Sequence, residues 1–251
     1  MSWASKRRAT YLFSLLGVVL VVIGVSTFAL FRPTPSCGNG KKDGTETDID
    51  CGGSCRAVCA QNVIAPIMRW SRSFEVTPGT YSAVAYVENP NSSTGAEAVS
   101  YEFRLLDAEG ILVAERKGST FISPGALMPV FEAGIRTGER VPVYTTFSFT
   151  EEPFWVRSAS RSGELLVREK LLSDDATAPR ITARLQNTTI KTLSNVQVVA
   201  VMFDASGNAI AASSTVVPRI ERSGTADIVF TWPAPFRTAP AQIDVIPRFA
   251  L

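Results

Sequence analysis

The stretch Val99–Leu105 reads Val-Ser-Tyr-Glu-Phe-Arg-Leu, in which apolar and polar side chains alternate at every step. Successive side chains of a β-strand point to opposite faces of a sheet, so a period of two predicts a strand with one buried face. A second stretch, Val196–Phe203, reads Val-Gln-Val-Val-Ala-Val-Met-Phe and is rich in the β-branched residues that favour strands. Together the two stretches indicate a protein built from β-sheets.

Other short strand-like segments recur along residues 63–251, and clusters of Gly, Pro, Asn and Asp separate them. The same part of the sequence carries no long amphipathic helix pattern. Short strands separated by turn residues predict a sandwich or a barrel. The further strand candidates are Ser82–Glu88, Ile111–Glu115, Val143–Phe149, Ile181–Leu185, Ala209–Ser213, Ala226–Thr231 and Ile243–Pro247.

Two parts of this region agree in the order and spacing of their residues. Asn89 is followed 18 residues later by Asp107, which opens an Asp-Ala-Glu-Gly turn, and Asn187 is followed 17 residues later by Asp204, which opens an Asp-Ala-Ser-Gly turn. We expect each asparagine to end a strand with an Asx turn and each glycine to take a positive φ in a hairpin turn. The agreement predicts a tandem duplication. Its two sandwiches span residues 63–160 and 161–251, each with a core of its own.

The run Phe103-Arg-Leu-Leu-Asp107 resembles the signature of the FxLYD family, named for Phe-x-Leu-Tyr-Asp. Leu106 stands at the tyrosine position, and Phe203 stands there in the second copy. The resemblance implies small Ig-like β-sandwiches of the kind found in bacterial envelope proteins, without known catalysis. The fold class is therefore an all-β ectodomain of two tandem Ig-like or FxLYD-like sandwiches. The duplication further predicts that Phe103 and Met202 are buried at equivalent strand positions.

An uncharged segment precedes the β-region. Residues 11–31 contain no charged side chain, and at 1.5 Å per residue they span about 31 Å, close to the thickness of a bilayer core. A cleaved signal peptide is one alternative, for which Thr27-Phe28-Ala29 is a poor small-x-small cleavage site. A buried core helix is another, but this segment is apolar all round rather than amphipathic. We predict one transmembrane helix that holds the chain in the lipid bilayer.

Basic residues give this helix a predicted orientation. Lys6, Arg7 and Arg8 precede the apolar segment, and only Arg32 follows it closely. The positive-inside rule then places residues 1–10 in the cytoplasm and the C-terminal part outside. The predicted location is the cell membrane, single-pass, with the N-terminus cytoplasmic and the C-terminus extracytoplasmic.

The four cysteines of the chain lie within 23 residues, among several glycines. So short a segment cannot bury a core of its own, and disulfides are the usual remedy in an oxidising compartment. Zinc is the alternative, but the spacing lacks paired C-x(2)-C knuckles. We predict a disulfide-rich module at residues 32–62, with three pairings open. Its disulfide residues are Cys37, Cys51, Cys55 and Cys59.

The same segment resembles a short module of bacterial surface proteins with the pattern C-x-NG-x-x-D-x-x-ET-D-x-D-CGG-x-C-x(3)-C. The resemblance implies an extracellular spacer or display module that often lies beside adhesive or repeat domains. Four acidic residues in it, Asp43, Glu46, Asp48 and Asp50, supply oxygen ligands among glycines and are the candidate calcium ligands. An EF-hand loop starting at Asp48 would place Cys59 at the bidentate glutamate position, so the module is not an EF-hand. A solvated acidic turn is the alternative to calcium binding.

Several classes of function are excluded. The sequence has no histidine, which removes Ser-His-Asp and Cys-His catalysis as well as histidine metal sites. The net charge is +2 and no basic cluster occurs beyond the N-terminus, so we expect no nucleic-acid partner. The neighbouring carboxylates Glu151-Glu152 and Asp174-Asp175 are not acid/base pairs, because adjacent strand residues point to opposite faces. We expect no enzyme, no catalytic residues and no cofactor besides the candidate calcium.

Two classes of function remain. The first is a structural or adhesive protein that presents tandem sandwiches at the cell surface to other envelope proteins or to cell-wall glycan. The second is a module that binds glycan or another ligand, or an accessory subunit of an envelope secretion or pilus machine. An exposed aromatic row favours glycan binding, and a bare apolar strand edge favours assembly by strand addition. The aromatic candidates, with core packing as their alternative, are Trp70, Tyr81, Phe154, Trp155 and Trp232.

Overall fold

The computed structural model describes residues 3–30, 36–174, 176–248 and 250, with the backbone alone for residues 4–10 and 29–30. The chain divides into two compact units, residues 1–53 and residues 54–251. The first unit contains helix α1 (Trp3–Leu30) and the turns of the cysteine-rich segment, and the second contains strands β1–β13 and a short 3-10 helix, η1 (Ala60–Asn62). The predicted fold class, all-β after one N-terminal apolar helix and a disulfide-rich segment, is confirmed.

Beyond Arg8, helix α1 carries no charged side chain and is apolar on every side. Within it, the 18 residues Tyr11–Phe28 form a continuous apolar window whose side chains are exposed in this unit. A helix with no polar face has no favourable contact with water, but in lipid it satisfies its own backbone hydrogen bonds. By length and composition α1 can cross a membrane, which supports the predicted anchor. Phe31, the last residue of the predicted span, lies outside the described residues.

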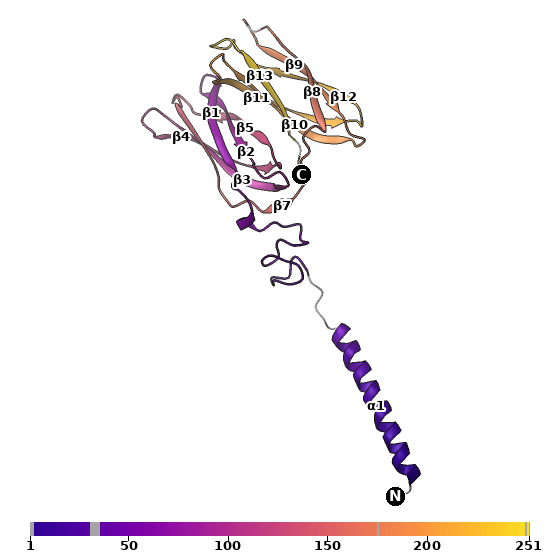
Figure 1. Cartoon of the computed structure of the whole chain (residues 1–251). Helices are drawn as coiled ribbons and strands as arrows, with labels where there is room; N and C mark the ends of the chain where they lie inside the picture. The colour runs from indigo at the N-terminus through magenta and orange to yellow at the C-terminus, as the bar shows by residue number, and fades with distance from the viewer. Residues whose placement is uncertain (1–2, 31–35, 175, 249, 251) are drawn as a thin grey trace. The chain divides into compact units, whose positions relative to one another are not determined.

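Two antiparallel sheets form the first sandwich (Figure 1). One sheet has the order β1-β2-β5 and is built from β1 (Ile67–Thr77), β2 (Thr80–Glu88) and β5 (Leu127–Arg136). The other has the order β4-β3-β6 and is built from β3 (Thr94–Leu106), β4 (Leu112–Ile122) and β6 (Tyr144–Phe149), with β7 (Trp155–Arg157) paired to β3.

The second sandwich repeats this arrangement strand for strand. One sheet has the order β12-β9-β8 and is built from β8 (Leu165–Ser173), β9 (Arg180–Asn187) and β12 (Thr225–Thr231). The other has the order β11-β10-β13 and is built from β10 (Leu193–Phe203), β11 (Ala209–Ile220) and β13 (Gln242–Arg248). Since β8–β13 pair in the same order as β1–β6, the two halves share one topology, as a tandem duplication requires.

Buried asparagines mark equivalent places in the two sandwiches. Asn89 Nδ2 donates to the carbonyl oxygen of Thr94 at 2.7 Å, and Asn187 Nδ2 donates to that of Lys191 at 2.7 Å. Each amide also donates, at 3.0 Å, to a carbonyl in the loop between the fourth and fifth strands of its sandwich. Each side chain therefore ties the loop after the second strand to the loop after the fourth, beyond the local Asx turn that was predicted.

The hairpin turns fix how β3 of the first sandwich aligns with β10 of the second, and this alignment differs from the predicted one. Gly110 and Gly207, both at φ 78°, close turns that begin at Asp107 and Asp204. A register shift follows Leu105 in β3, and the same shift follows Met202 in β10. Met202 is thus equivalent to Leu105, and the expected equivalence with Phe103 was wrong. The spacing from Asn89 to Asp107 exceeds that from Asn187 to Asp204 by one residue. This difference falls in the loop before β3 and β10, so the two strands themselves align without a gap.

Each sandwich has its own core between its two sheets. In the first, Phe103 and Leu105 of β3 are fully buried against Val87 of β2 and Val130 of β5. The core of the second lies between β9 and β12 on one side and β10, β11 and β13 on the other. These two clusters are where alternating sequences such as Val99–Leu105 place their apolar residues.

A third cluster lies between the two sandwiches. It joins Val84 and Tyr86 of β2 to Val199 and Val201 of β10, all buried. Aromatic rings surround it, with the Trp70 and Tyr86 rings stacked at 4.6 Å. Each sandwich thus has the core of its own that was expected, but β2 and β10 are apolar on both faces, and each contributes to this interface cluster as well as to its own core.

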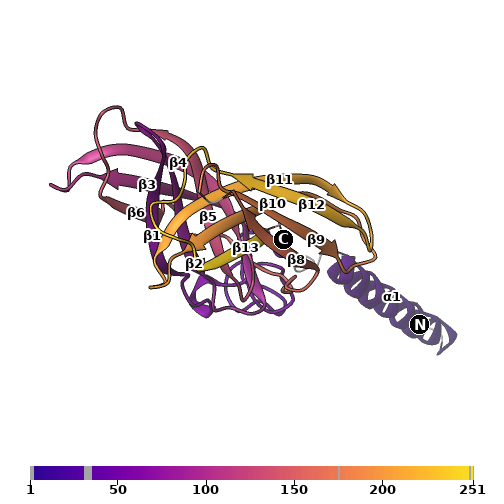
Figure 2. The ribbon, with the colours of Figure 1, turned by 90° about the horizontal axis from the view of Figure 1, so that it is seen from above.

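The sheets consequently stack in four layers, in the order β4-β3-β6, β1-β2-β5, β11-β10-β13 and β12-β9-β8 (Figures 1 and 2). The two sheets that meet in the middle are not equivalent in the repeat, so the sandwiches pack head to tail. The two outermost faces are charged. Lys117 pairs with Glu102 at 3.5 Å on one, and on the other Arg184 pairs with Glu169 and Asp227 at 2.8 Å each.

Arg248 of β13 adds a polar tie between the sandwiches. Its guanidinium donates to Thr120 Oγ1 at 2.7 Å and lies over the Phe121 ring, 4.7 Å from the ring centroid, both at the end of β4. It also donates to Gln197 of β10 at 3.1 Å. Burial lowers the pKa of Arg248 to about 10. The buried arginine therefore links strands from both sandwiches through neutral acceptors.

Candidate functional site

The five aromatic candidates do not form an exposed row. Trp70 packs at the interface between the sandwiches, and Tyr81 and Trp155 belong to the first core. Trp232 belongs to the second core, and Phe154 alone of the five is widely exposed, at 70%. Packing in the cores and at the interface, which the sequence favoured for these residues, is thus their main role, and they do not assemble a sugar-binding face. Two of them nevertheless line one cavity.

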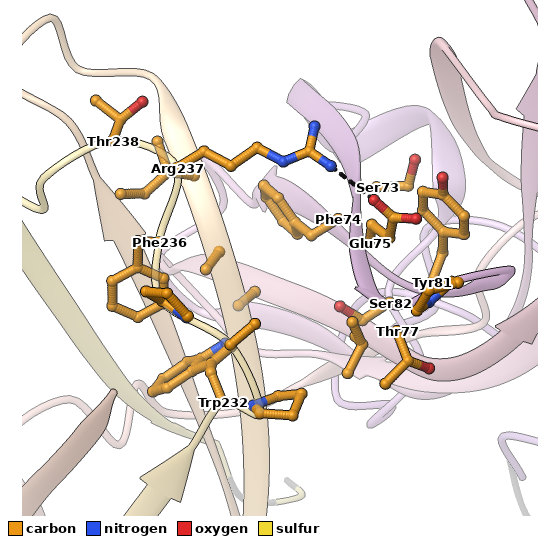
Figure 3. Close-up of a pocket in the computed structure, with 18 of the residues that line it drawn as sticks. Ser73, Phe74, Glu75, Thr77, Tyr81, Ser82, Trp232, Phe236, Arg237 and Thr238 are labelled. Atoms are coloured by element: carbon orange, nitrogen blue, oxygen red, sulfur yellow. Dashed lines mark hydrogen bonds and ion pairs between the residues drawn. The ribbon is translucent and has the colours of Figure 1, made fainter. Parts of the chain in front are cut away.

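This cavity opens between the two sandwiches and has a volume of about 650 Å³ (Figure 3). Ligand pockets in proteins commonly measure about 300–1,000 Å³. One wall is formed by the end of β1, the start of β2 and the β5–β6 loop. The other is formed by the start of β11 and the loop from Trp232 to Thr238, between β12 and β13. Residues from both halves of the duplication therefore meet around a single opening.

An ion pair spans the two walls. Arg237 Nη2 lies 2.7 Å from Glu75 Oε2, and Figure 3 shows the two side chains reaching toward each other. The arginine side chain is largely exposed, so the pair contributes little stability by itself. Burial, followed by the charge of Glu75, raises the pKa of the Tyr81 hydroxyl, which stays protonated at neutral pH. The cavity thus has one charged edge and otherwise neutral walls.

Two buried polar groups among the cavity residues have no hydrogen-bond partner in the described part of the chain. They are the Ser82 hydroxyl and the Trp232 indole N–H. Both side chains are more than nine-tenths buried, with 2% of Ser82 and 8% of Trp232 exposed. Buried polar groups are almost always hydrogen-bonded, so two exceptions at one cavity call for a physical explanation.

Two of the edge strands that the structure describes, β4 and β8, are not the bare apolar edges that favour strand addition. Edge strand β4 carries Glu115, Arg116 and Lys117 in succession. Edge strand β8 has a register shift between Arg168 and Leu171, at a place where Glu169 takes φ 53°. Charges and bulges of this kind protect edge strands against pairing with other chains.

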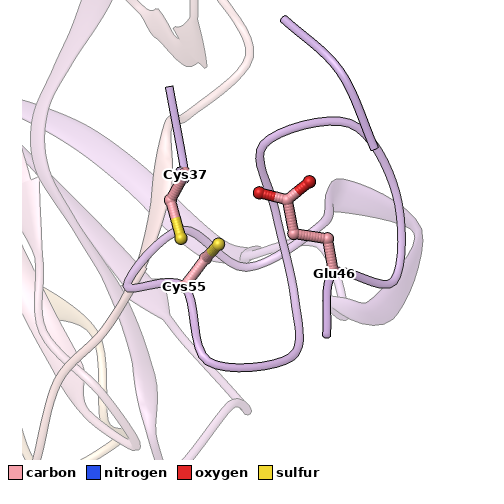
Figure 4. A group of neighbouring side chains, drawn as sticks. All are labelled: Cys37, Glu46 and Cys55. Atoms are coloured by element: carbon pink, nitrogen blue, oxygen red, sulfur yellow. The ribbon is translucent and has the colours of Figure 1, made fainter. Parts of the chain in front are cut away.

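The cysteine-rich segment contains two disulfides, since all four cysteines are disulfide-bonded. Figure 4 draws Cys37, Glu46 and Cys55, the metal-ligand residue types that gather in this segment. Both cysteines are in disulfides, and a disulfide sulfur is not the thiolate that a zinc site requires. The chemistry of this group therefore does not fit the zinc alternative.

The four candidate calcium ligands hold turns through hydrogen bonds. Asp50 accepts from the backbone N–H of Asn39 at 2.9 Å, and Asp43 accepts from the side-chain amide of the same residue at 2.7 Å. Glu46 accepts from the backbone N–H of Asp43 at 3.1 Å, and Asp48 accepts from the following N–H at 2.8 Å. No three of these carboxylates lie within 4.8 Å of one another among the described residues. Calcium binding stays a prediction.

Two adjacent glycines explain part of the module's sequence pattern. A Cβ added at Gly53 would lie 1.8 Å from the carbonyl oxygen of Thr45, and one added at Gly52 would lie 2.3 Å from Thr47 Oγ1. Both glycines also take positive φ, at 54° and 76°. Only glycine fits both requirements, because other residues pay a steric cost in this region of φ.

We expect Gly53→Ala to disrupt disulfide formation, because the loop cannot close around the added methyl group. Gly38→Ala is the matched control, since a Cβ at Gly38 meets nothing within 4 Å. Alkylation of the denatured protein followed by intact-mass measurement counts the free thiols. Gly53→Ala should show free thiols in a substantial fraction of molecules, and Gly38→Ala should show none. Fully oxidised Gly53→Ala protein with unchanged pairing would contradict this account of the turn.

No family model and no curated protein matches the chain. Among solved structures it is similar to the crystal structure of red sea bream transglutaminase, with 12% sequence identity and a TM-score of 0.24. The match covers 74% of this chain and 30% of that one, so the chain spans less than a third of that protein. A likeness at this level carries no argument about fold or activity.

Proposed function

We propose that the chain is a single-pass membrane protein that displays its β-sheet unit outside the cytoplasm as a structural or interaction component of the cell envelope. The observation that carries the proposal is the order of two features along the chain. An apolar helix long enough to cross a membrane is followed closely by a segment with two disulfides. Disulfides persist in oxidising compartments, so the cysteine-rich segment and the strands after it belong outside.

The basic residues before the helix support the same orientation. Lys6, Arg7 and Arg8 precede the apolar segment, and positive charge is retained on the cytoplasmic side. The proposal assigns no catalysis to the chain. Glu75, the carboxylate at the cavity, is held by Arg237, and the sequence supplies no histidine as a general base.

The stacked sheets fit a role in display. Two sandwiches that share an apolar interface form a stiffer body than two domains joined only by a linker. The FxLYD-like run Phe103–Asp107 and the surface-protein cysteine pattern support the same proposal of a bacterial envelope protein. The second candidate function is the binding of a ligand. The cavity of about 650 Å³ between the sandwiches favours it.

The topology is tested by protease digestion of intact spheroplasts that carry the chain with an epitope at each end. We expect external protease to remove the C-terminal epitope and to leave the N-terminal one intact until the membrane is permeabilised. Intact mass of the membrane-bound protein should equal the 27.1 kDa of the chain plus the two epitopes, which tests against cleavage of the helix as a signal peptide. A C-terminal epitope that resists protease until permeabilisation, or a released protein without the helix, would refute the proposal.

A further inference from the structure

Strand β11 lies at the margin of the sheet β11-β10-β13, and one side of it is an unprotected edge (Figure 2). Residues 209–217 read Ala-Ile-Ala-Ala-Ser-Ser-Thr-Val-Val, without a charged residue or a proline. Residues 211–217 pair with β10 without a register shift, and β10 is the one described strand that pairs with β11. The backbone groups on the other side of β11 are therefore open to a further strand.

The other described edge strands carry features that oppose such pairing. Charged side chains occur in β1, β4, β5, β7, β8, β12 and β13. Strand β6 is uncharged, but it has only 6 residues, and the carbonyl oxygen of Thr145 in it accepts a hydrogen bond from Ser71 of β1 at 2.7 Å. Charge and short length are common protections of edge strands, and β11 has neither.

The duplication provides an internal comparison for β11. Leu105 of β3 is equivalent to Met202 of β10, and the register of each strand with its neighbour then makes β4 equivalent to β11. In this alignment the three charged residues Glu115–Lys117 of β4 correspond to Ala212–Ser214 of β11. The same strand thus has a charged edge in the first sandwich and an uncharged edge in the second.

Packing within the chain explains only part of this difference. Ala212 is buried in the interface cluster, where a charge would be unfavourable. Ser213 and Ser214 belong to none of the three apolar clusters and are partly exposed. Charged side chains at these two positions would reach water, as Lys117 does in β4, so their absence points to a contact outside the single chain.

The open part of β11 is bounded at both ends. The carbonyl oxygen of Ala209 accepts a hydrogen bond from Arg72 Nη1 at 2.7 Å, and Pro218 has no N–H to donate. A further strand can therefore pair with residues 210–217.

This segment is complementary to itself in the antiparallel direction. A two-fold axis perpendicular to a sheet passes through a residue that faces its own copy, and Ser214 lies near the middle of the segment. With Ser214 on the axis, the facing pairs are Ser213–Thr215, Ala212–Val216 and Ala211–Val217. Hydroxyls face hydroxyls, small side chains face β-branched ones, and no like charges meet, which favours cross-strand pairing. Val216, 56% exposed in the single chain, gains an apolar neighbour.

We propose that two copies of the chain pair antiparallel along β11, with Ser214 on the two-fold axis. The pairing joins the two β11-β10-β13 sheets, each of three strands, into one continuous sheet. The partner is a second copy because the facing pairs match this chain's own sequence on both sides of the axis. The inference rests on the proposed function in one respect: anchors in the same membrane hold two copies close together, which raises their effective concentration.

Cysteine cross-linking of the full chain in proteoliposomes tests the pairing. Ser214→Cys adds one free thiol, since the four natural cysteines are in disulfides. Residues that face each other in antiparallel strands have Cα atoms about 4.5–5.5 Å apart, within reach of a disulfide. We expect mild oxidation to give a dimer linked at position 214 of both copies, as mapped by mass spectrometry. Val229→Cys, at a position 39% exposed on edge strand β12, is the matched control and should stay largely monomeric.

Flotation of the proteoliposomes reports membrane anchoring separately. Protein that floats with the lipid but does not cross-link counts against the β11 pairing and not against the anchor. Protein that does not float counts against the proposed function.

A lysine at the same position tests whether β11 holds the dimer together. Ser214→Lys introduces the residue type that Lys117 provides in β4, and the two-fold axis would bring two lysines face to face. We expect the dissociation constant to rise at least about 10-fold, measured by energy transfer between labelled copies in proteoliposomes over a range of lipid-to-protein ratios. The melting temperature should stay unchanged, because Ser214 is partly exposed. Val229→Lys should change neither quantity.

Three outcomes would overturn the proposal. Wild-type protein could show no energy transfer at any lipid-to-protein ratio. Ser214→Cys could cross-link no more than Val229→Cys does. Ser214→Lys could associate as strongly as the wild type, which would place the contact elsewhere in the chain.

Discussion

Replacing Phe103 with alanine is expected to destabilise the β-sheet unit by about 3–5 kcal/mol, the usual cost of deleting a buried phenylalanine side chain. Phe103 is fully buried in β3 and packs edge-on against Phe147, with 5.0 Å between the ring centroids. A loss of this size approaches the whole stability of a typical domain. Because the first sandwich also covers the apolar face of β10, we expect the second sandwich to lose stability together with it.

Chemical denaturation of the full chain, followed by tryptophan fluorescence, measures this change. Phe154→Ala is the matched control, because it deletes the same side chain at a position that is 70% exposed. It should change stability by less than about 0.5 kcal/mol. Equal effects of the two substitutions would contradict the assignment of Phe103 to the core. An unfolded first sandwich beside a second that keeps its wild-type stability would show that the interface does not couple them.

Val201→Asp is expected to separate the two sandwiches. Val201 of β10 is fully buried in the interface cluster and lies opposite Asp244 of β13, so a carboxylate there would be buried beside a like charge. An uncompensated buried charge costs roughly 3–5 kcal/mol. Wild-type protein should melt in one cooperative transition, and the variant should melt in two, at least one of them at a lower temperature.

The dependence on pH gives this prediction a specific signature. Burial and the neighbouring Asp244 raise the folded-state pKa of the introduced carboxyl above its unfolded value. The folded state then binds the proton more tightly, so the penalty is full above the folded pKa and shrinks as pH falls through it. Differential scanning calorimetry at about pH 5 and pH 8 should therefore show the larger loss at pH 8. Val216→Asp, at a position 56% exposed on the adjacent β11, should show neither a second transition nor this pH dependence.

The strands that alternate regularly were predictable from the sequence, and two of the missed strands, β5 and β8, break the pattern for a physical reason. Seven of the nine stretches proposed as strands lie wholly within strands, and the other two, Ile111–Glu115 and Val143–Phe149, begin one residue before β4 and β6. Strands β1, β5, β7 and β8 were not proposed. Pro129 interrupts the pattern of β5, and it is tolerated because β5 is an edge strand with one side free of ladder hydrogen bonds. In β8, the bulge at Glu169 shifts the alternation by one face.

The interface between the sandwiches has a signal in the sequence, in the two strands that meet there. Residues 83–87 of β2 and 198–203 of β10 are apolar without alternation, whereas their equivalents in β9 and β3 alternate. A strand that loses alternation in one copy only has a second apolar face to cover. The difference between equivalent strands therefore identifies the faces of β2 and β10 that meet at the interface.

The cavity could be predicted only in part. Tyr81 and Trp232 were both candidates for a binding face, but 151 positions separate them, and nothing local relates them. Their meeting follows from the stacking of β1 and β2 on β11, which is a tertiary property. The unpartnered indole and hydroxyl are equally invisible in sequence, because their hydrogen bonding depends on what surrounds them.

Head-to-tail packing also affects how many sandwiches can stack on one another. A contact between two unlike faces is not closed by a two-fold axis, so unless the copies form a ring, each added copy would leave the same pair of unlike faces free for the next. Growth would then continue as a filament unless both ends were unfit for another contact. Here the terminal faces carry ion pairs such as Lys117–Glu102 and Arg184–Asp227, which a further sheet would have to desolvate. The charge on the two outermost faces therefore limits the stack to two sandwiches.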